Sequence, residues 1–142
     1  MPARFISDQG FGFSGKAIET ISGGQIVRAL SGATVLTATN SLSNVMELAL
    51  VDAAGDHTTA VGVAQGTGVS GDRIGVGTVG NYGFFASNGV TAGNLVFADG
   101  SVTSADAVLA LLDASVGSVA AYAFGRALST AASGQRVVVN LR

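Results

Sequence analysis

The segment Gly10–Lys16 (GFGFSGK) has a spacing of glycine and lysine close to that of a phosphate-binding loop. In such a loop, backbone N–H groups cradle phosphates, the lysine reaches the terminal phosphate, and a hydroxyl after the lysine holds magnesium. Ala17 stands at that last position and carries no hydroxyl. The pattern indicates neither a buried strand before the segment nor a helix after it, so we do not expect nucleotide binding here.

The G-x-G-x-x-G motif of dinucleotide-binding proteins occurs three times, beginning at Gly10, Gly66 and Gly75. Such matches arise readily in a chain with 21 glycines. None of them opens a predicted helix, whose N-terminus would have to hold the pyrophosphate. These glycines are more typical of turns, bulges and strands that approach closely.

His57 is the only histidine, and it stands beside Asp52 and Asp56 in a predicted turn. A serine triad would also need a strained nucleophile turn of the G-x-S-x-G type, which the sequence lacks. The turn could bind calcium weakly, although exposed turn residues are the better interpretation. The nine Asp and Glu residues are scattered, without a pair suited to acid–base catalysis. We therefore predict no catalytic residue, no metal and no cofactor, and hence no enzyme.

The composition indicates a surface that is covered by a partner. Only 11% of the 142 residues are charged, against about 25% in an ordinary soluble domain. A monomer with so few charges would be poorly solvated, so we expect self-association or burial against a partner, with a surface of Ser, Thr and Gly as the alternative. The net charge is −2 and no basic run is present, which argues against nucleic-acid binding.

Membrane insertion and secretion are not indicated by the sequence. The first ten residues contain no apolar stretch of the signal-peptide type. The longest uncharged run, Ile74–Ala98, holds six glycines and three asparagines in strand-like clusters, which is not the pattern of a membrane helix. The absence of cysteine excludes disulfides and thiolate metal sites.

A repeat organises the elements that would position any site. Ala60–Val79 and Ala123–Arg142 align without a gap and are identical at eight of twenty positions. A shorter echo precedes each copy, because Gly23–Val27 matches Ala92–Val96 in residue type. Two copies are too few for a solenoid. We therefore predict an all-β fold, a small β-barrel or sandwich built from two similar halves.

The two copies also place Arg73 and Arg136 at equivalent positions after Ser-Gly, and we interpret both as charges at the rim of a barrel. Asp99-Gly100 predicts a two-residue hairpin turn. Ser104–Asp113 (SADAVLALLD) combines an N-cap serine, an early aspartate and good helix formers, and it predicts one short helix.

The domain organisation predicted from these features is simple. Residues 1–15 form an extended N-terminal arm, and residues 16–142 form a single β domain that contains the internal repeat (60–79 and 123–142). Phe5, Phe11 and Phe13 in the arm have no local burial site, so we expect them to dock elsewhere. Docking on the protein's own β domain and docking on a partner are both left open by the sequence.

The repeated pattern resembles the head-decoration, or capsid cement, proteins of tailed bacteriophages and related viruses. Its elements are a small-Gly-polar-aliphatic-Val strand start, an Ala/Val-Gly-x-Ala strand, and Ser-Gly-x-Arg-aliphatic-x-Val. Thr34–Val51 follows no pattern of that family. The matching segments are Ile21–Leu30, Ala60–Val79, Gly89–Asp99 and Ala123–Arg142.

The resemblance implies a structural virion protein that binds the outer surface of an icosahedral capsid and stabilises it against internal DNA pressure. Its partners would be the major capsid protein and itself, as a homotrimer at local three-fold positions, on the capsid exterior of particles assembled in the host cytoplasm. The segment Phe5–Phe13 also follows no pattern of that family, so the family does not support a role for the arm. The prediction that Phe5, Phe11 and Phe13 contact the capsid or a neighbouring subunit depends only on their lack of a local burial site. A ligand- or carbohydrate-binding β module is the main alternative, weakened by the absence of Trp and the presence of only two Tyr. A small hydrolase is a third and weaker alternative.

Overall fold

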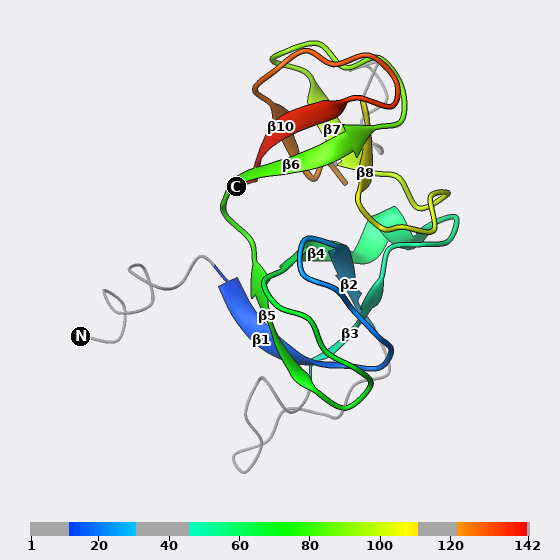
Figure 1. Cartoon of the computed structure of the whole chain (residues 1–142), viewed down its shortest axis with the longest axis vertical. Coiled ribbons are helices and arrows are strands. Elements are labelled where there is room, and N and C mark those ends of the chain that lie inside the picture. The colour runs from blue at the N-terminus through cyan, green and yellow to red at the C-terminus, as the bar shows by residue number, and fades with distance from the viewer. Residues whose placement is uncertain (1–11, 31–45, 111–121, 142) are drawn as a thin grey trace, which may run out of the picture. The chain divides into compact units, whose positions relative to one another are not determined.

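The computed structural model describes residues 12–30, 46–110 and 122–141, and it confirms the all-β prediction (Figure 1). One short 3-10 helix, η1 (Asp56–Thr59), is the only helical element in these residues. No helix within the described ranges is long and apolar enough to cross a membrane. The strands are β1 (Gly12–Ala17), β2 (Ile26–Ala29), β3 (Glu47–Leu50), β4 (Ala60–Ala64), β5 (Arg73–Gly77), β6 (Gly80–Ala86), β7 (Leu95–Ala98), β8 (Ala107–Ala110), β9 (Gly125–Ala127) and β10 (Arg136–Leu141).

The chain divides into two compact units, and each contains one closed β-barrel. Unit 1 holds barrel 1, with the strand order β1-β3-β2-β4-β5. Unit 2 holds barrel 2, in which β6, β8, β7, β9 and β10 follow one another in the same cyclic order. Unit 2 also includes residues 51–60, which connect β3 to β4 and contain η1. The predicted single β domain of residues 16–142 is thus divided in two.

The two barrels share their strand directions and register. The first and third strands of each are parallel, with Lys16 opposite Glu47 in barrel 1 and Phe85 opposite Ala107 in barrel 2. The pairings β1–β5, β2–β3 and β4–β5 in barrel 1, and β6–β10, β9–β10, β7–β8 and β7–β9 in barrel 2, are antiparallel. Each half of the sequence therefore closes a barrel of its own, and the two halves follow one plan.

The predicted equivalence of Ala60–Val79 and Ala123–Arg142 is confirmed for the described residues. Ala64 pairs with Val76 between β4 and β5, and Ala127 pairs with Val139 between β9 and β10. These pairs occupy the same positions in the two sequence copies. The intervening turns match as well, because Gly71 (φ 96°) and Gly134 (φ 83°) both adopt the left-handed conformation that favours glycine.

The cores consist of small and aliphatic side chains that alternate with outward-facing residues. Along β10, Val137, Val139 and Leu141 are buried while Arg136 and Val138 are exposed, as period-two alternation requires. Burying each such aliphatic side chain contributes about 1.5–3 kcal/mol. The largest fully buried side chains of the described residues are Ile21, Ile26, Val27, Leu48, Val63 and Val76 in unit 1 and Val51, Phe84, Val90, Val96, Val108 and Leu141 in unit 2.

The short helix predicted for Ser104–Asp113 is wrong. Ala107–Ala110 is β8, which pairs in parallel with β6 and antiparallel with β7. Ala105 has φ 57°, which interrupts a right-handed helix at its first turn. An apolar run of four residues fits a buried strand as well as a helix, and here pairing on both edges overrides the local helix propensity. Residues 111–113 lie outside the described ranges.

Two predicted boundaries also change. Gly12–Ala17 is β1, so the arm predicted for residues 1–15 ends before Gly12. Asp99-Gly100 does not form a two-residue hairpin turn, because β7 pairs with β8 and the connection runs from residue 99 to 106. In both places the strand that forms is selected by a distant partner strand, which the local turn chemistry does not reveal.

Candidate functional site

Residues 12–16 of the segment that matched a phosphate-binding loop belong to strand β1, and residues 10 and 11 lie outside the described ranges. Gly12 to Lys16 pair in register with β5 from Gly77 to Arg73. Their backbone N–H groups face a neighbouring strand and cannot converge on a phosphate. Gly62 and Gly125 show what the glycines do instead. A Cβ there would lie 2.4 Å from the Gly77 carbonyl oxygen and 2.5 Å from that of Asn140, so close strand approach requires glycine.

His57 lies in an aromatic cluster within unit 2. Its ring centroid is 5.5 Å from that of Phe97 and 5.9 Å from that of Tyr122, the second contact being edge-to-face. Asp56 Oδ2 accepts hydrogen bonds from the amides of Asp52 (3.3 Å) and Ala53 (3.0 Å), so this carboxylate holds its own turn. In the described parts of the chain, no three His, Cys, Asp or Glu side chains gather to hold a metal.

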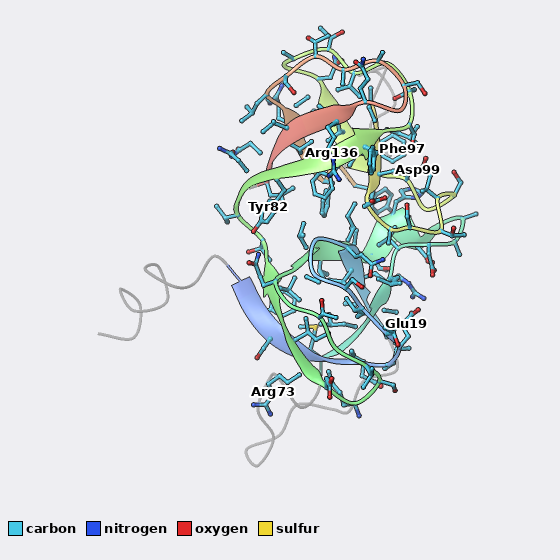
Figure 2. The ribbon with its side chains drawn as sticks, viewed as in Figure 1. Glu19, Arg73, Tyr82, Phe97, Asp99 and Arg136 are labelled. Carbon is cyan, nitrogen blue, oxygen red and sulfur yellow. The ribbon has the colours of Figure 1, made fainter. Side chains whose placement is uncertain are left out.

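Arg73 and Arg136 occupy the same place in the two barrels but have different neighbours (Figure 2). Arg73 stands opposite Lys16 across β1 and β5. Arg136 stands opposite Phe85, and its guanidinium lies 4.3 Å from the centroid of that ring. The equivalent outer faces therefore differ. Barrel 1 has two basic residues opposite each other, and barrel 2 has a cation–π pair.

Of the three phenylalanines predicted to contact a partner, the structure places one. Phe13 lies in β1 opposite Val76 and is half-buried. It is part of the wall of barrel 1 and does not belong to an arm. Phe5 and Phe11 lie outside the described residues.

Asp99, which sequence reasoning treated only as a turn residue, is the one buried charged side chain in the described ranges. It directly follows β7, and 6% of its surface is exposed. Its Oδ1 accepts hydrogen bonds from the Ser101 amide (3.0 Å) and the Ser101 hydroxyl (2.6 Å).

Burial by itself would raise the pKa of Asp99. Hydrogen bonds from the Ser101 hydroxyl, the Ser87 hydroxyl and the Ser101 amide outweigh burial, so the pKa lies below its ordinary value of 3.8. Asp99 is therefore a negative charge at neutral pH.

Asp99 lines a shallow recess in barrel 2 with a volume of about 440 Å³, which we call the Asp99 recess. The Ser104 hydroxyl donates to the Asp106 carboxylate, and the Ser133 hydroxyl donates to the Ser87 carbonyl at 3.0 Å. Alanine and valine side chains complete the walls, with Phe85 at one side. The polar lining consists of Ser87, Asp99, Ser104, Asp106 and Ser133.

The repeat holds the signal that would have drawn attention to this recess. Phe97-Ala98-Asp99 follows the second echo where Arg28-Ala29-Leu30 follows the first. Asp99 stands where the first half has Leu30, directly after a buried strand, so the two halves differ at this position. The difference can be interpreted only once β2 and β7 are known to be equivalent strands.

The fold defines the class of this protein as a tandem of two five-stranded β-barrels. No protein-family model matches the chain, and no curated protein matches it. A solved structure with a similar fold is the head fiber gp8.5 N base in bacteriophage phi29. The two superpose with a TM-score of 0.55 and 16% sequence identity, over 92% of each chain. At this identity the likeness concerns the fold.

Proposed function

We propose that this protein is a structural, non-catalytic component of a phage virion that binds the outer surface of the icosahedral capsid and stabilises it as a decoration, or cement, protein. The observation that carries the proposal is the shared fold with the base of a phage head fiber across 92% of both chains. A likeness that covers 92% of the chain includes most of both barrels. It agrees with the resemblance of the repeated sequence pattern to capsid cement proteins.

The surface of the barrels gives physical support. Leu128 and Val138 are 51% and 42% exposed, and the Leu128 amide donates to the Val138 carbonyl, so the two apolar residues are neighbours on barrel 2. Val69 on barrel 1 is 58% exposed. Exposed apolar side chains on a chain with 11% charged residues favour burial against a partner. Repeated weak contacts on a lattice add up without a deep pocket.

The partners in this proposal are the major capsid protein and further copies of the chain, arranged as a homotrimer. A homotrimer matches the local three-fold positions of an icosahedral shell. Phe5, Phe11 and Phe13 are the residues proposed to contact the capsid or a neighbouring subunit, with Phe13 acting from the end of β1. Multi-angle light scattering should give the mass of a trimer, or of a monomer that trimerises on the shell, and a stable dimer would contradict this arrangement.

The test is made on particles of the phage that encodes the chain. Mass spectrometry of gradient-purified virions should detect the protein, and antibodies against it should label intact particles from outside. Particles from a deletion mutant should release DNA at lower temperature, and added purified protein should restore the wild-type temperature. A protein that is absent from purified virions, or present only inside them, is not a decoration protein.

A further inference from the structure

The two barrels have different residue types at equivalent positions around the Asp99 recess. The Asp99 amide donates to the Ala107 carbonyl at the start of β8, just as the Leu30 amide donates to the Glu47 carbonyl at the start of β3. Corresponding backbone hydrogen bonds fix two more equivalences around the same point. The three pairs of positions are Ile18 and Ser87, Leu30 and Asp99, and Met46 and Asp106.

Barrel 1 thus has apolar side chains at these three positions. Barrel 2 places a hydroxyl and two carboxylates at the same three positions. Burying an ionised carboxylate carries a desolvation cost, and aliphatic residues at the site would avoid it. Asp99 holds the β7–β8 connection through its hydrogen bonds from Ser101, but the strand plan that the two barrels share does not require carboxylates at these positions.

The charges around the recess define what it can accept. Asp99 and Asp106 are both in its lining, and hydroxyls of three serines surround them. Arg136 contacts one lining residue, because its guanidinium lies over Phe85, and its Nη1 donates to the Gly83 carbonyl at 3.4 Å. Arg136 itself does not line the recess. Acidic and hydroxyl groups above alanine and valine walls complement a side chain with an apolar stem and a cationic head.

We propose that the Asp99 recess is a docking site for a lysine or arginine side chain presented by a partner protein. The cationic head would lie against the carboxylates, and the aliphatic stem would contact Val102 and the alanines of the wall. The identification of the partner as a virion protein rests on the proposed function. The recess and its preference for a cationic side chain do not depend on that function.

The first experiment uses the full-length protein labelled with ¹⁵N and three blocked tripeptides, Gly-Lys-Gly, Gly-Arg-Gly and Gly-Gln-Gly, as probes. A single ion pair of this kind contributes only about 0.2–1 kcal/mol, so the titration extends to roughly 100 mM peptide at low salt. The lysine or arginine peptide should shift amide signals of Ser87, residues 99–106 and Ser133. The glutamine peptide should not shift them, and Ile18 and Leu30 of barrel 1 serve as an internal control.

The first variant replaces recess residues of barrel 2 with the residues that stand at the equivalent positions of barrel 1. The triple change S87I/D99L/D106M installs the residues of barrel 1, which this fold accommodates, and it should abolish the peptide-induced shifts while the circular dichroism spectrum is kept. D106N is a milder variant that should weaken peptide binding by about 1.4- to 5-fold, as expected for loss of one ion pair of about 0.2–1 kcal/mol. D52N removes a carboxylate from the same unit outside the recess and should change nothing.

Shifts that persist in the triple variant, or that are absent with both basic peptides, overturn the proposal. Shifts at these residues with N-acetylglucosamine or glucose, in place of the basic peptides, overturn it in favour of a carbohydrate site. A wild-type mass that falls to monomer in D106N but not in D52N would assign the basic side chain to a second copy and refute a separate partner. The peptide result stands whether or not the chain is found in virions, so the failures of the two proposals are distinguishable.

Discussion

Asp99 is the residue at which charge, burial and hydrogen bonding can be tested together. Its pKa is lowered because hydrogen bonds from Ser101 and Ser87 outweigh burial. A carboxyl group whose pKa is lower in the folded protein contributes stability above its ordinary pKa of 3.8, and loses it as the pH falls through the folded value.

Asp99→Asn should accordingly lower the free energy of unfolding of unit 2 by about 1–2 kcal/mol at pH 7, the size of a charge-assisted hydrogen bond. The difference from the wild type should shrink steadily below pH 4. Urea unfolding between pH 3 and 7 measures it by tyrosine fluorescence, because the chain has no Trp and its two tyrosines, Tyr82 and Tyr122, both belong to unit 2. A difference that is constant over this range would exclude ionised Asp99 as the cause.

Two glycines of barrel 2 are needed for different reasons, and their alanine variants should differ. At Gly134 an added Cβ meets no atom within 4 Å, so only the positive φ opposes it, at about 1–2 kcal/mol. At Gly125 an added Cβ would lie 2.5 Å from the Asn140 carbonyl oxygen and 2.7 Å from Val139 Cγ1. Gly125→Ala should therefore destabilise unit 2 more than Gly134→Ala in chemical denaturation. Equal effects would mean that β9 and β10 can separate at little cost.

Among the elements, residues 51–60 have an unexpected role. They connect two strands of barrel 1 in sequence, yet they belong to unit 2. His57 contacts Phe97 and Tyr122, and a Cβ on Gly100 would lie 2.2 Å from the Ala53 carbonyl oxygen. This connection is therefore packed on barrel 2 and is part of its structure.

His57→Ala should lower the stability of unit 2 by about 1–2 kcal/mol, because two aromatic contacts are lost. Thr59→Ala is the matched control, since Thr59 is exposed and makes one long hydrogen bond to the Asp56 carbonyl at 3.4 Å. Tyrosine fluorescence during urea unfolding separates the two variants. Similar midpoints for both would show that the aromatic cluster does not stabilise unit 2.

At the level of the complete chain, the start of β1 at Gly12 decides which N-terminal deletions should leave the barrels folded and so can test the proposed capsid attachment. Removing residues 2–11 leaves β1 intact, so the barrels should keep their melting temperature while attachment to undecorated shells weakens roughly tenfold or more. Removing residues 2–14 also deletes half of β1, which pairs with both β3 and β5, and should unfold barrel 1. Unchanged attachment after the shorter deletion would place the capsid contact on the barrels themselves.

The all-β class and the repeat could be predicted because they depend on local patterns. Alternating side chains in β10, the Ser-Gly turns at Gly71 and Gly134, and the small-residue strand starts are all readable within a few residues. The matching of Ala60–Val79 to Ala123–Arg142 required only the comparison of one segment with another.

Three features depended on contacts between distant segments, and only the tertiary structure decided them. β8 is a strand because β6 and β7 pair with both its edges, although its residues favour a helix. Each half closes its own barrel because β5 pairs with β1, and β10 pairs with β6, although more than fifty residues separate the paired positions in the chain. The Asp99 recess exists because residues from β6, the β7–β8 connection and the turn before β10 meet at one point, and sequence spacing carries no record of that meeting.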